Sequence, residues 1–239
     1  MRRKLWLAAA AAAAVLALSQ WSPQGMLQTA QATAEQMAQD TDSKEQQQTE
    51  TARKEKPKVA LTFDDGPHLI YTEELLDGLK ERKVCATFFL IGKNIEGKEE
   101  LVRRMEEEGH LIGNHTYHHV KLTGISEDQA EQEILETCEK ISEVTGTYTS
   151  FVRPPFGEWK KNLDFEITMI PVSWNVDSRD WTTQNSEKIV KRVVKDVDEG
   201  DIILMHDIFE SSVQAALEII DILSGQGYEF VTVDELLLE

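Results

Sequence analysis

Cysteine is scarce in this sequence, and aromatic and basic residues are few. Only Cys85 and Cys138 occur among 239 residues, so the chain can form one disulfide at most. Cys85 lies in an apolar, strand-like run and Cys138 on the apolar stripe of an expected helix, where thiols usually pack as small hydrophobic groups. Because export would also permit a disulfide, the sequence alone leaves the pairing of the two cysteines open.

Acidic residues outnumber basic ones by 43 to 25, which gives the chain a formal net charge of −18. Residues 1–57 contain seven Lys or Arg and six Asp or Glu, so the remainder carries a net charge of −19. Binding to a phosphate backbone requires clustered Lys and Arg side chains. The composition therefore argues against nucleic acid as a partner, and a neutral substrate is easier to accommodate.

The long hydrophobic run of the sequence lies at its amino terminus. A basic start, Met1–Lys4, precedes fourteen apolar residues, Leu5–Leu18, and polar sequence follows, which is the layout of an export signal. A membrane-spanning helix needs about 20 apolar residues. We therefore expect residues 1–27 to form a cleavable signal peptide, with an uncleaved signal anchor as the alternative.

Residues 28–57 contain almost no large apolar side chains and are dominated by Gln, Thr, Ala, Glu and Lys. Such a segment cannot bury enough apolar surface to offset the entropy lost on ordering, so we predict a disordered polar linker. It could act as a tether of roughly 30 Å or be a dispensable spacer. The folded domain is expected over residues 58–239.

Within this domain, apolar runs of strand character alternate with helical periodicity. The expected strands are residues 59–63, 86–91, 111–112, 150–152, 170–174, 202–205 and 230–233. The expected helices are 126–145, 186–197 and 211–224, the first with a capping box of Ser126 and Gln129. The alternation predicts an α/β fold with a parallel sheet, without distinguishing a barrel from a doubly wound sheet.

Several polar residues follow the expected strands, where active sites of parallel α/β proteins collect. Successive strand side chains point to opposite faces, so of Asp64 and Asp65 one can bind a metal while the other faces the substrate. His115 and His119 are four residues apart, which on a helical turn places both rings on one face. With Asp65 they would form a catalytic zinc site with an open position. Alternatively, the histidines lie on the surface and the aspartates in an ordinary turn.

Two further residues have both a structural and a catalytic interpretation. His206 ends an apolar strand and can be a buried core residue. However, Asp180 offers a carboxylate that could fix the tautomer of His206 and raise its pKa for proton transfer near neutral pH. Arg153 can be a solvated turn residue, or a permanent cation that holds a carboxylate in place and ionised.

These residues belong to five motifs: Thr62–Pro67 (TFDDGP), His115–His119 (HTYHH), Arg153–Gly157 (RPPFG), Asp177–Trp181 (DSRDW) and Ile202–His206 (IILMH). In this order, the motifs resemble those of the polysaccharide deacetylase family, whose domain is also called the NodB homology domain (carbohydrate esterase family 4). The resemblance implies a distorted (β/α) barrel, with residues 58–239 as the catalytic domain.

The resemblance also implies a role for each site residue. It implies that Asp64 is the general base, oriented by Arg153, and that His206 is the general acid, tuned by Asp180. The metal ligands that it implies are Asp65, His115 and His119, with Zn²⁺ as the expected ion and Co²⁺ or another divalent metal as the alternative.

The resemblance further implies four substrate contacts, which are Pro155, Phe156, Trp181 and Leu204. Phe156 stands where the family usually has Tyr. The backbone N–H of this position is expected to contact the oxyanion, so the change should affect sugar contacts more than catalysis.

The implied reaction is removal of N-acetyl groups from N-acetylglucosamine residues of an extracellular polysaccharide, with peptidoglycan as the expected polymer. The export signal places the domain outside the cytoplasmic membrane, extracellular or associated with the cell wall. Membrane contact is expected only through an uncleaved N-terminal segment. Chitooligosaccharide deacetylase or acetylxylan esterase activity is an alternative within the family. A catalytically silent carbohydrate-binding domain is disfavoured, because no metal, base or acid position is substituted.

Overall fold

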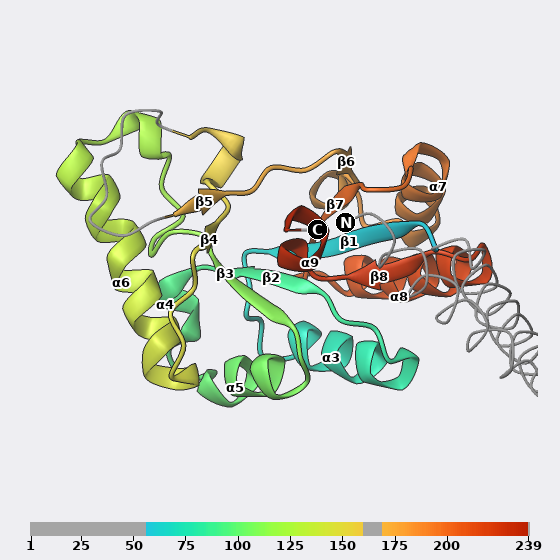
Figure 1. Ribbon diagram of the computed structural model, residues 1–239, viewed down its shortest axis with the longest axis horizontal. Coiled ribbons are helices and arrows are strands. Elements are labelled where there is room, and N and C mark those ends of the chain that lie inside the picture. Colours follow the sequence, from blue (N-terminus) through green and yellow to red (C-terminus); the bar gives the residue numbers. More distant parts are fainter. Residues whose placement is uncertain (1–55, 160–168, 239) are drawn as a thin grey trace, which may run out of the picture. The chain divides into compact units, whose positions relative to one another are not determined.

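The computed structural model describes residues 56–159 and 169–238 (Figure 1). They belong to one compact unit, Lys56–Glu239. The signal segment expected over residues 1–27 and almost all of the expected linker lie outside the described residues. Among the helices of the described part, none combines the length and the apolar character that crossing a membrane requires.

The described residues contain eight strands, all paired in parallel. The strands are β1 (Lys58–Asp64), β2 (Thr87–Leu90), β3 (Leu111–Asn114), β4 (Phe151–Val152), β5 (Ile170–Pro171), β6 (Val176–Asp177), β7 (Ile202–His206) and β8 (Glu229–Val231). Their order in the sheet is β5-β4-β3-β2-β1-β7-β6, and β8 pairs with β1. The expected parallel α/β arrangement is confirmed. The expected strand at residues 170–174 is shorter than predicted, and β6, which follows it, was not expected from the sequence.

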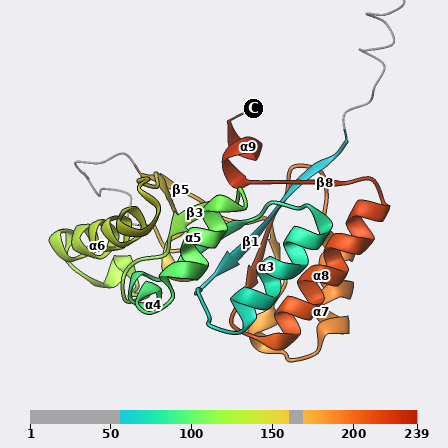
Figure 2. The same cartoon turned by 90° about the horizontal axis from the view of Figure 1, so that it is seen from below.

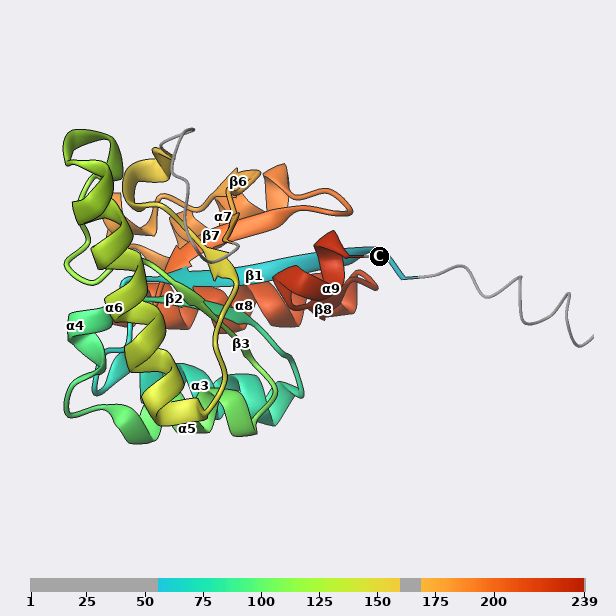
Figure 3. The same cartoon turned by 60° about the vertical axis from the view of Figure 1, so that its left-hand side comes forward.

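Helices connect most of these strands. They are α3 (Tyr71–Arg82), α4 (Gly92–Ile95), α5 (Glu99–Glu107), α6 (Glu127–Thr145), α7 (Ser186–Asp196), α8 (Glu210–Gly225) and α9 (Val233–Leu237), with short 3₁₀ turns η1 (Leu122–Gly124), η2 (Pro155–Gly157) and η3 (Asp180–Thr182). Figure 2 shows α5, α3, α8 and α7 side by side along one face of the sheet. In Figure 3, α6 runs beside α4 and α5.

The expected ends of α6 are confirmed. Ser126 Oγ accepts a hydrogen bond from the Gln129 N–H (3.2 Å), and the Gln129 side chain accepts one from the Ser126 N–H (3.2 Å). This capping box satisfies two donors that a helix otherwise leaves unpaired. Gly146 ends the helix in a left-handed conformation with φ 77°, which glycine adopts without steric cost.

The main hydrophobic core lies between the sheet and the row of helices α5, α3, α8 and α7. The rings of Phe63 on β1 and Phe88 on β2 stack there, with centroids 5.4 Å apart. A smaller cluster, including Phe89 and Val233, packs α9 against the opposite face. Cys85 and Cys138 are free thiols, and the buried Cys138 accepts a hydrogen bond from Asn114 Nδ2 (3.2 Å). Cys138 therefore behaves as the small buried side chain that the sequence indicates.

The register of the sheet places the motif residues together at the carboxyl ends of the strands. Asp64, the last residue of β1, is paired with His206, the last residue of β7, and with Phe89 of β2. On the β3 side, Asn114 is paired with Val152, so the segments that follow β3 and β4 also leave the sheet at this end. Because all the strands are parallel, their carboxyl ends bring distant motifs together.

Candidate active site

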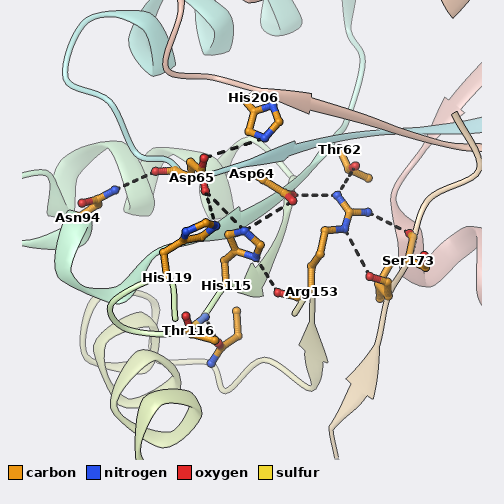
Figure 4. Close-up of polar contacts among 12 residues, drawn as sticks. Thr62, Asp64, Asp65, Asn94, His115, Thr116, His119, Arg153, Ser173 and His206 are labelled. Carbon is orange, nitrogen blue, oxygen red and sulfur yellow. Dashed lines mark hydrogen bonds and ion pairs between the residues drawn. The ribbon is translucent and has the colours of Figure 1, made fainter. Parts of the chain in front are cut away.

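Asp64 and Asp65 form the centre of the site at the end of β1. Asp64 is 3% exposed, and Asp65 takes a left-handed conformation with φ 73°. This turn alters the strand alternation that we expected, and both carboxylates lie near the same imidazole (Figure 4). The Nε2 atom of His115 is 3.7 Å from Asp64 Oδ2 and 3.5 Å from Asp65 Oδ1. Asn94 Nδ2 donates to the carbonyl oxygen of Asp65 (2.8 Å) and holds the turn in place.

The segment that carries His115 and His119 is a loop, so the expectation of a helical turn is wrong. Thr116 and His119 both have positive φ angles, 64° and 58°. The carbonyl oxygens of Thr116 and Tyr117 accept hydrogen bonds from the N–H groups of Gly92 and Lys93 at the start of α4 (3.0 and 3.1 Å). Because these carbonyls bond to a distant segment, the loop needs no helical i to i+4 bonds.

The loop nevertheless brings the two imidazoles to Asp65. His119 Nε2 lies 3.4 Å from Asp65 Oδ1, and one ligand atom from each of Asp65, His115 and His119 lies within 4.8 Å of the others. His115 Nδ1 donates to the carbonyl oxygen of Arg153 (2.6 Å), so Nδ1 carries a proton and Nε2 is the ring nitrogen that faces Asp65. Burial and the nearby His115 lower the pKa of His119, which favours the neutral ring that a metal needs.

This donor set fits a divalent metal ion. Asp65 Oδ1 is buried and has no hydrogen-bond partner among the described residues. A buried carboxylate oxygen without a partner is costly, and a cation shared with two neutral imidazoles would remove that cost. Two nitrogens and one carboxylate oxygen are also the ligands of catalytic zinc sites, which keep one position open. The site therefore has the composition that was expected from the motifs.

Arg153 is fully buried beside Asp64, and the interpretation of this arginine as a solvated turn residue is wrong. Its Nη1 atom donates to Asp64 Oδ1 (2.8 Å) and to Thr62 Oγ1 (2.6 Å). Its other nitrogens donate to the carbonyl oxygens of Val172 (3.4 Å) and Ser173 (3.2 Å), as Figure 4 shows for Ser173. The guanidinium carbon also lies 4.2 Å from the ring centroid of Phe89. These contacts fix the orientation of the Arg153 guanidinium group relative to the Asp64 carboxylate.

His206 lies on the other side of Asp65, with its Nε2 4.0 Å from Asp65 Oδ2. Its Nδ1 donates to Asp180 Oδ1 (2.8 Å). Burial lowers the pKa of His206, but the hydrogen bond and charge of Asp180 outweigh burial and raise it to about 9. Burial raises the pKa of Asp180, but the hydrogen bond to His206 outweighs burial, so the pKa of Asp180 lies below its usual value. The imidazolium is thus stabilised at neutral pH.

A cavity of about 430 Å³ opens over these groups. It is lined by Asp64, Asp65, His115, His119, Pro154, Phe156, Trp174, Asp177, Trp181, Leu204 and His206. Three of the four expected substrate contacts are in this lining. The fourth, Pro155, is buried at the start of η2, and Pro154 takes its place in the lining.

Trp174, Asp177 and Asp207 had no expected role from the sequence. The first two line the cavity, and an apolar strand followed by the DSRDW motif could have indicated both. Asp207, next to His206, is fully buried, and burial raises its pKa to about 7. A carboxylate directly after a buried strand was the available signal for Asp207.

Comparison with known proteins identifies the family. The family model described as polysaccharide deacetylase matches residues 51–172. The chain belongs to the polysaccharide deacetylase family. It is 41% identical over 178 residues, 74% of the chain, to the peptidoglycan-N-acetylmuramic acid deacetylase PdaC of Bacillus subtilis. It is 39% identical over 179 residues, 75% of the chain, to the peptidoglycan-N-acetylglucosamine deacetylase PgdA of Listeria monocytogenes. The matches cover 38% of the length of each of these relatives.

Solved structures of family members share the fold. That of B. subtilis PdaC aligns with a TM-score of 0.73 at 40% identity and covers 76% of this chain and 90% of that one. A family 4 acetyl xylan esterase from Clostridium thermocellum, in complex with a cobalt ion, aligns with a TM-score of 0.71 at 35% identity. The alignment covers 76% of this chain and 90% of the esterase chain. The expected distorted (β/α) barrel of the NodB homology type is confirmed.

Proposed function

We propose that this chain is an exported, zinc-dependent hydrolase that removes N-acetyl groups from N-acetylglucosamine residues of peptidoglycan. The observation that carries the proposal is the placement of two ionisable pairs on either side of one metal-ligand cluster. Asp64 with Arg153 lies on one side of the cluster, and His206 with Asp180 on the other. Hydrolysis of an amide needs a base for the attacking water and an acid for the leaving amine.

The proposed metal ligands are Asp65, His115 and His119. When bound there, a Zn²⁺ ion supplies polarisation of the acetyl carbonyl and lowers the pKa of a water molecule. These three side chains would hold the ion, and neighbouring groups orient them: the Arg153 carbonyl oxygen accepts a hydrogen bond from His115 Nδ1, and Asn94 fixes the backbone of Asp65. Such supporting contacts orient metal ligands and raise their affinity.

Asp64 is proposed to remove the proton from the attacking water. Arg153 donates to Asp64 Oδ1, which leaves Oδ2 directed toward the metal-ligand side, 3.7 Å from His115 Nε2. The role proposed for Arg153 is therefore to orient the base.

His206 is proposed to protonate the amine as the C–N bond breaks. Because Nδ1 donates to Asp180, Nε2 is the nitrogen on the side of Asp65. With a pKa of about 9, this nitrogen carries a proton at neutral pH and can donate it. An amine is a poor leaving group unless it is protonated, so the acid matters more for an amide than for an ester.

The remaining groups of the cavity are proposed to bind the acetyl group and its sugar. Trp181 and Leu204 would form the walls around the acetyl methyl group. Phe156, in a left-handed conformation with φ 63°, would direct its backbone N–H to the oxyanion. A single donor of this kind contributes roughly 3 to 4 kcal/mol to the stabilisation of comparable transition states.

The substrate and the location rest on two separate supports. Curated relatives at about 40% identity are named peptidoglycan deacetylases, one for N-acetylglucosamine and one for N-acetylmuramic acid. The sequence begins with the pattern of an export signal, followed by a polar segment of about thirty residues that could reach roughly 30 Å. Together these favour a wall glycan near the membrane surface as the polymer.

The deciding experiment measures kcat/KM of the full chain on four acetylated substrates at one pH and one zinc concentration. They are peptidoglycan, a peptidoglycan in which only the muramic acid is acetylated, N-acetylglucosamine oligomers and acetylated xylan. Acetate release is measured together with the identity of the newly deacetylated sugar. We expect free amine on glucosamine residues of peptidoglycan. A higher kcat/KM on xylan would contradict the proposed amide hydrolysis. Deacetylation of muramic acid in preference to glucosamine would contradict the proposed sugar. Action on the oligomers without action on peptidoglycan would contradict the proposed polymer.

A further inference from the structure

Asp207 is a buried carboxylate that the proposed reaction does not use. Its side chain has no solvent exposure, and its Oδ2 atom accepts a hydrogen bond from the hydroxyl group of Thr72. The same hydroxyl accepts a hydrogen bond from the backbone N–H of His68 (2.7 Å). The β7 end is therefore joined to the first turn of α3 and, through it, to the segment that follows Asp65.

Asp207 also lies directly against the residue after Asp65. A Cβ atom built on Gly66 would lie 2.5 Å from both carboxylate oxygens of Asp207, so a side chain has no room there. On its other side this segment bonds to the chain after β2, where the Ile91 N–H donates to the carbonyl oxygen of Gly66 (3.1 Å). Asn94 donates to the carbonyl of Asp65 in the same region. The segment after Asp65 is thus held between the ends of β7 and β2, the strands on either side of β1.

A carboxylate in this position is unfavourable for stability alone. Its Oδ1 atom has no hydrogen-bond partner among the described residues, and burying an unpaired polar atom costs free energy. An apolar side chain would avoid that cost but could not accept the hydrogen bond from the Thr72 hydroxyl group. Groups that lower stability in this way are found at functional sites, where geometry matters more than stability.

We infer that Asp207 is a positioning residue: through Thr72 and Gly66 it fixes the segment that carries Asp65 against the strand end that carries His206. The relationship that it maintains is the 4.0 Å separation between Asp65 Oδ2 and His206 Nε2. Its effect on turnover rests on the proposed function, whereas its effect on metal affinity requires only the metal site.

The test uses two pairs of variants of the full chain. Thr72→Val removes the hydroxyl group while keeping the shape of the side chain, and Thr72→Ser keeps the hydroxyl. Asp207→Ala removes the acceptor, and Asp207→Asn keeps an acceptor oxygen in a side chain of nearly the same volume. The Zn²⁺ dissociation constant is measured on the metal-free protein by competition with a chromophoric chelator. Values of kcat and KM on peptidoglycan are measured on the loaded protein.

We expect Thr72→Val and Asp207→Ala to weaken Zn²⁺ binding by roughly 10-fold, the lower range for groups that support metal ligands. Their kcat should fall by about 10-fold or more with KM nearly unchanged, because the substrate contacts remain in place. Thr72→Ser and Asp207→Asn should stay within about 3-fold of wild type in both constants. If Asp207→Ala does not fold, the comparison of the two Thr72 variants decides.

Thr87→Val is the matched control for lost stability. Thr87 is also fully buried, and its hydroxyl oxygen accepts a hydrogen bond from the Val233 N–H (3.0 Å) at the amino end of β2, away from the site. It should lower Tm without changing Zn²⁺ affinity. The inference is wrong if Thr72→Val and Asp207→Ala bind Zn²⁺ like wild type, or if Thr87→Val weakens Zn²⁺ binding as much as they do. A wild-type protein that binds no Zn²⁺ contradicts the proposed metal site itself, and with it the role of Asp207.

Discussion

Both oxygens of the Asp180 carboxylate accept hydrogen bonds from His206. Oδ1 bonds to the ring Nδ1 (2.8 Å) and Oδ2 to the backbone N–H (2.8 Å). The N–H of Trp181 also donates to Oδ1 (2.9 Å), so η3 and β7 are joined at this carboxylate. The arrangement fixes the orientation of the ring as well as its tautomer, and it accounts for the pKa of about 9 despite burial.

This pair predicts the alkaline limb of the pH profile. The rate should fall as pH rises through about 9, because the acid form of His206 is lost there. Asp180→Asn removes the charge that raises the pKa of His206 while burial continues to lower it, so the limb should move to lower pH by about one unit or more. The measurement is kcat on an amide substrate from pH 6 to pH 10.

His206→Ala is the companion variant for the same prediction. It should retain zinc and lose rate by on the order of 10² to 10⁴, the usual contribution of a proton-transfer group. Normal turnover by His206→Ala, or an alkaline limb that stays in place in Asp180→Asn, would show that His206 is a structural residue.

The buried ion pair of Arg153 and Asp64 predicts that charge alone is insufficient at position 153. Arg153→Lys keeps the charge but cannot donate to Asp64, Thr62 and two carbonyl oxygens with one planar group. We expect kcat to fall by roughly 10- to 100-fold, with Zn²⁺ affinity within about 3-fold of wild type. Asp64→Asn, which removes the base, should cost on the order of 10² to 10⁴ and also retain zinc. Full turnover by Arg153→Lys would refute the orienting role.

Phe156 offers a test of the backbone role proposed for this position. Its side chain is 65% exposed, so the hydroxyl group of a tyrosine would reach solvent without disturbing the packing. Phe156→Tyr should therefore leave kcat within about 3-fold and change mainly KM, because the N–H that is proposed to face the oxyanion is the same. The two constants are measured on one peptidoglycan preparation. A kcat change above about 10-fold, with KM constant, would assign the side chain itself to catalysis.

The capping box of α6 predicts a local stability effect without a functional one. Ser126→Ala should lower the free energy of unfolding by about 1 kcal/mol, because the Gln129 N–H loses its acceptor. For a domain of this size the expected decrease in Tm is about 2 to 4 °C. Thermal unfolding and acetate release are measured on the same sample. A loss of activity at temperatures where the variant is fully folded would contradict this separation.

The pattern of the sequence was sufficient for features that depend on local order. The strands other than β6, the capped helix α6 and the polar residues at the ends of β1 and β7 follow from periodicity and from the position of Ser126, Asp64 and His206. In a parallel sheet, residues at strand ends converge whichever loops connect them. This convergence accounts for the proximity of Asp64, Asp65 and His206, whereas their assignment as proton-transfer groups and metal ligand came from the resemblance of the five motifs to the family.

Features set by contacts between distant segments could not be predicted in the same way. The loop that carries His115 and His119 depends on hydrogen bonds to Gly92 and Lys93, some two dozen residues earlier in the chain. The spacing of two histidines contains no information about those partners. Likewise, the burial of Arg153 depends on Phe89 and on carbonyl groups of the segment after β5. Tertiary contacts of this kind override local propensity.

The most direct test of the central claim is removal and return of the metal in one preparation. The full chain is stripped with a chelator, its metal content is measured, and acetate release from peptidoglycan is followed as Zn²⁺ is added back. We predict no turnover in the stripped protein and full recovery at one Zn²⁺ per chain, whereas Asp65→Asn should bind Zn²⁺ more weakly and recover only at higher concentration. Full activity of the metal-free protein, or wild-type Zn²⁺ affinity in Asp65→Asn, would contradict the account.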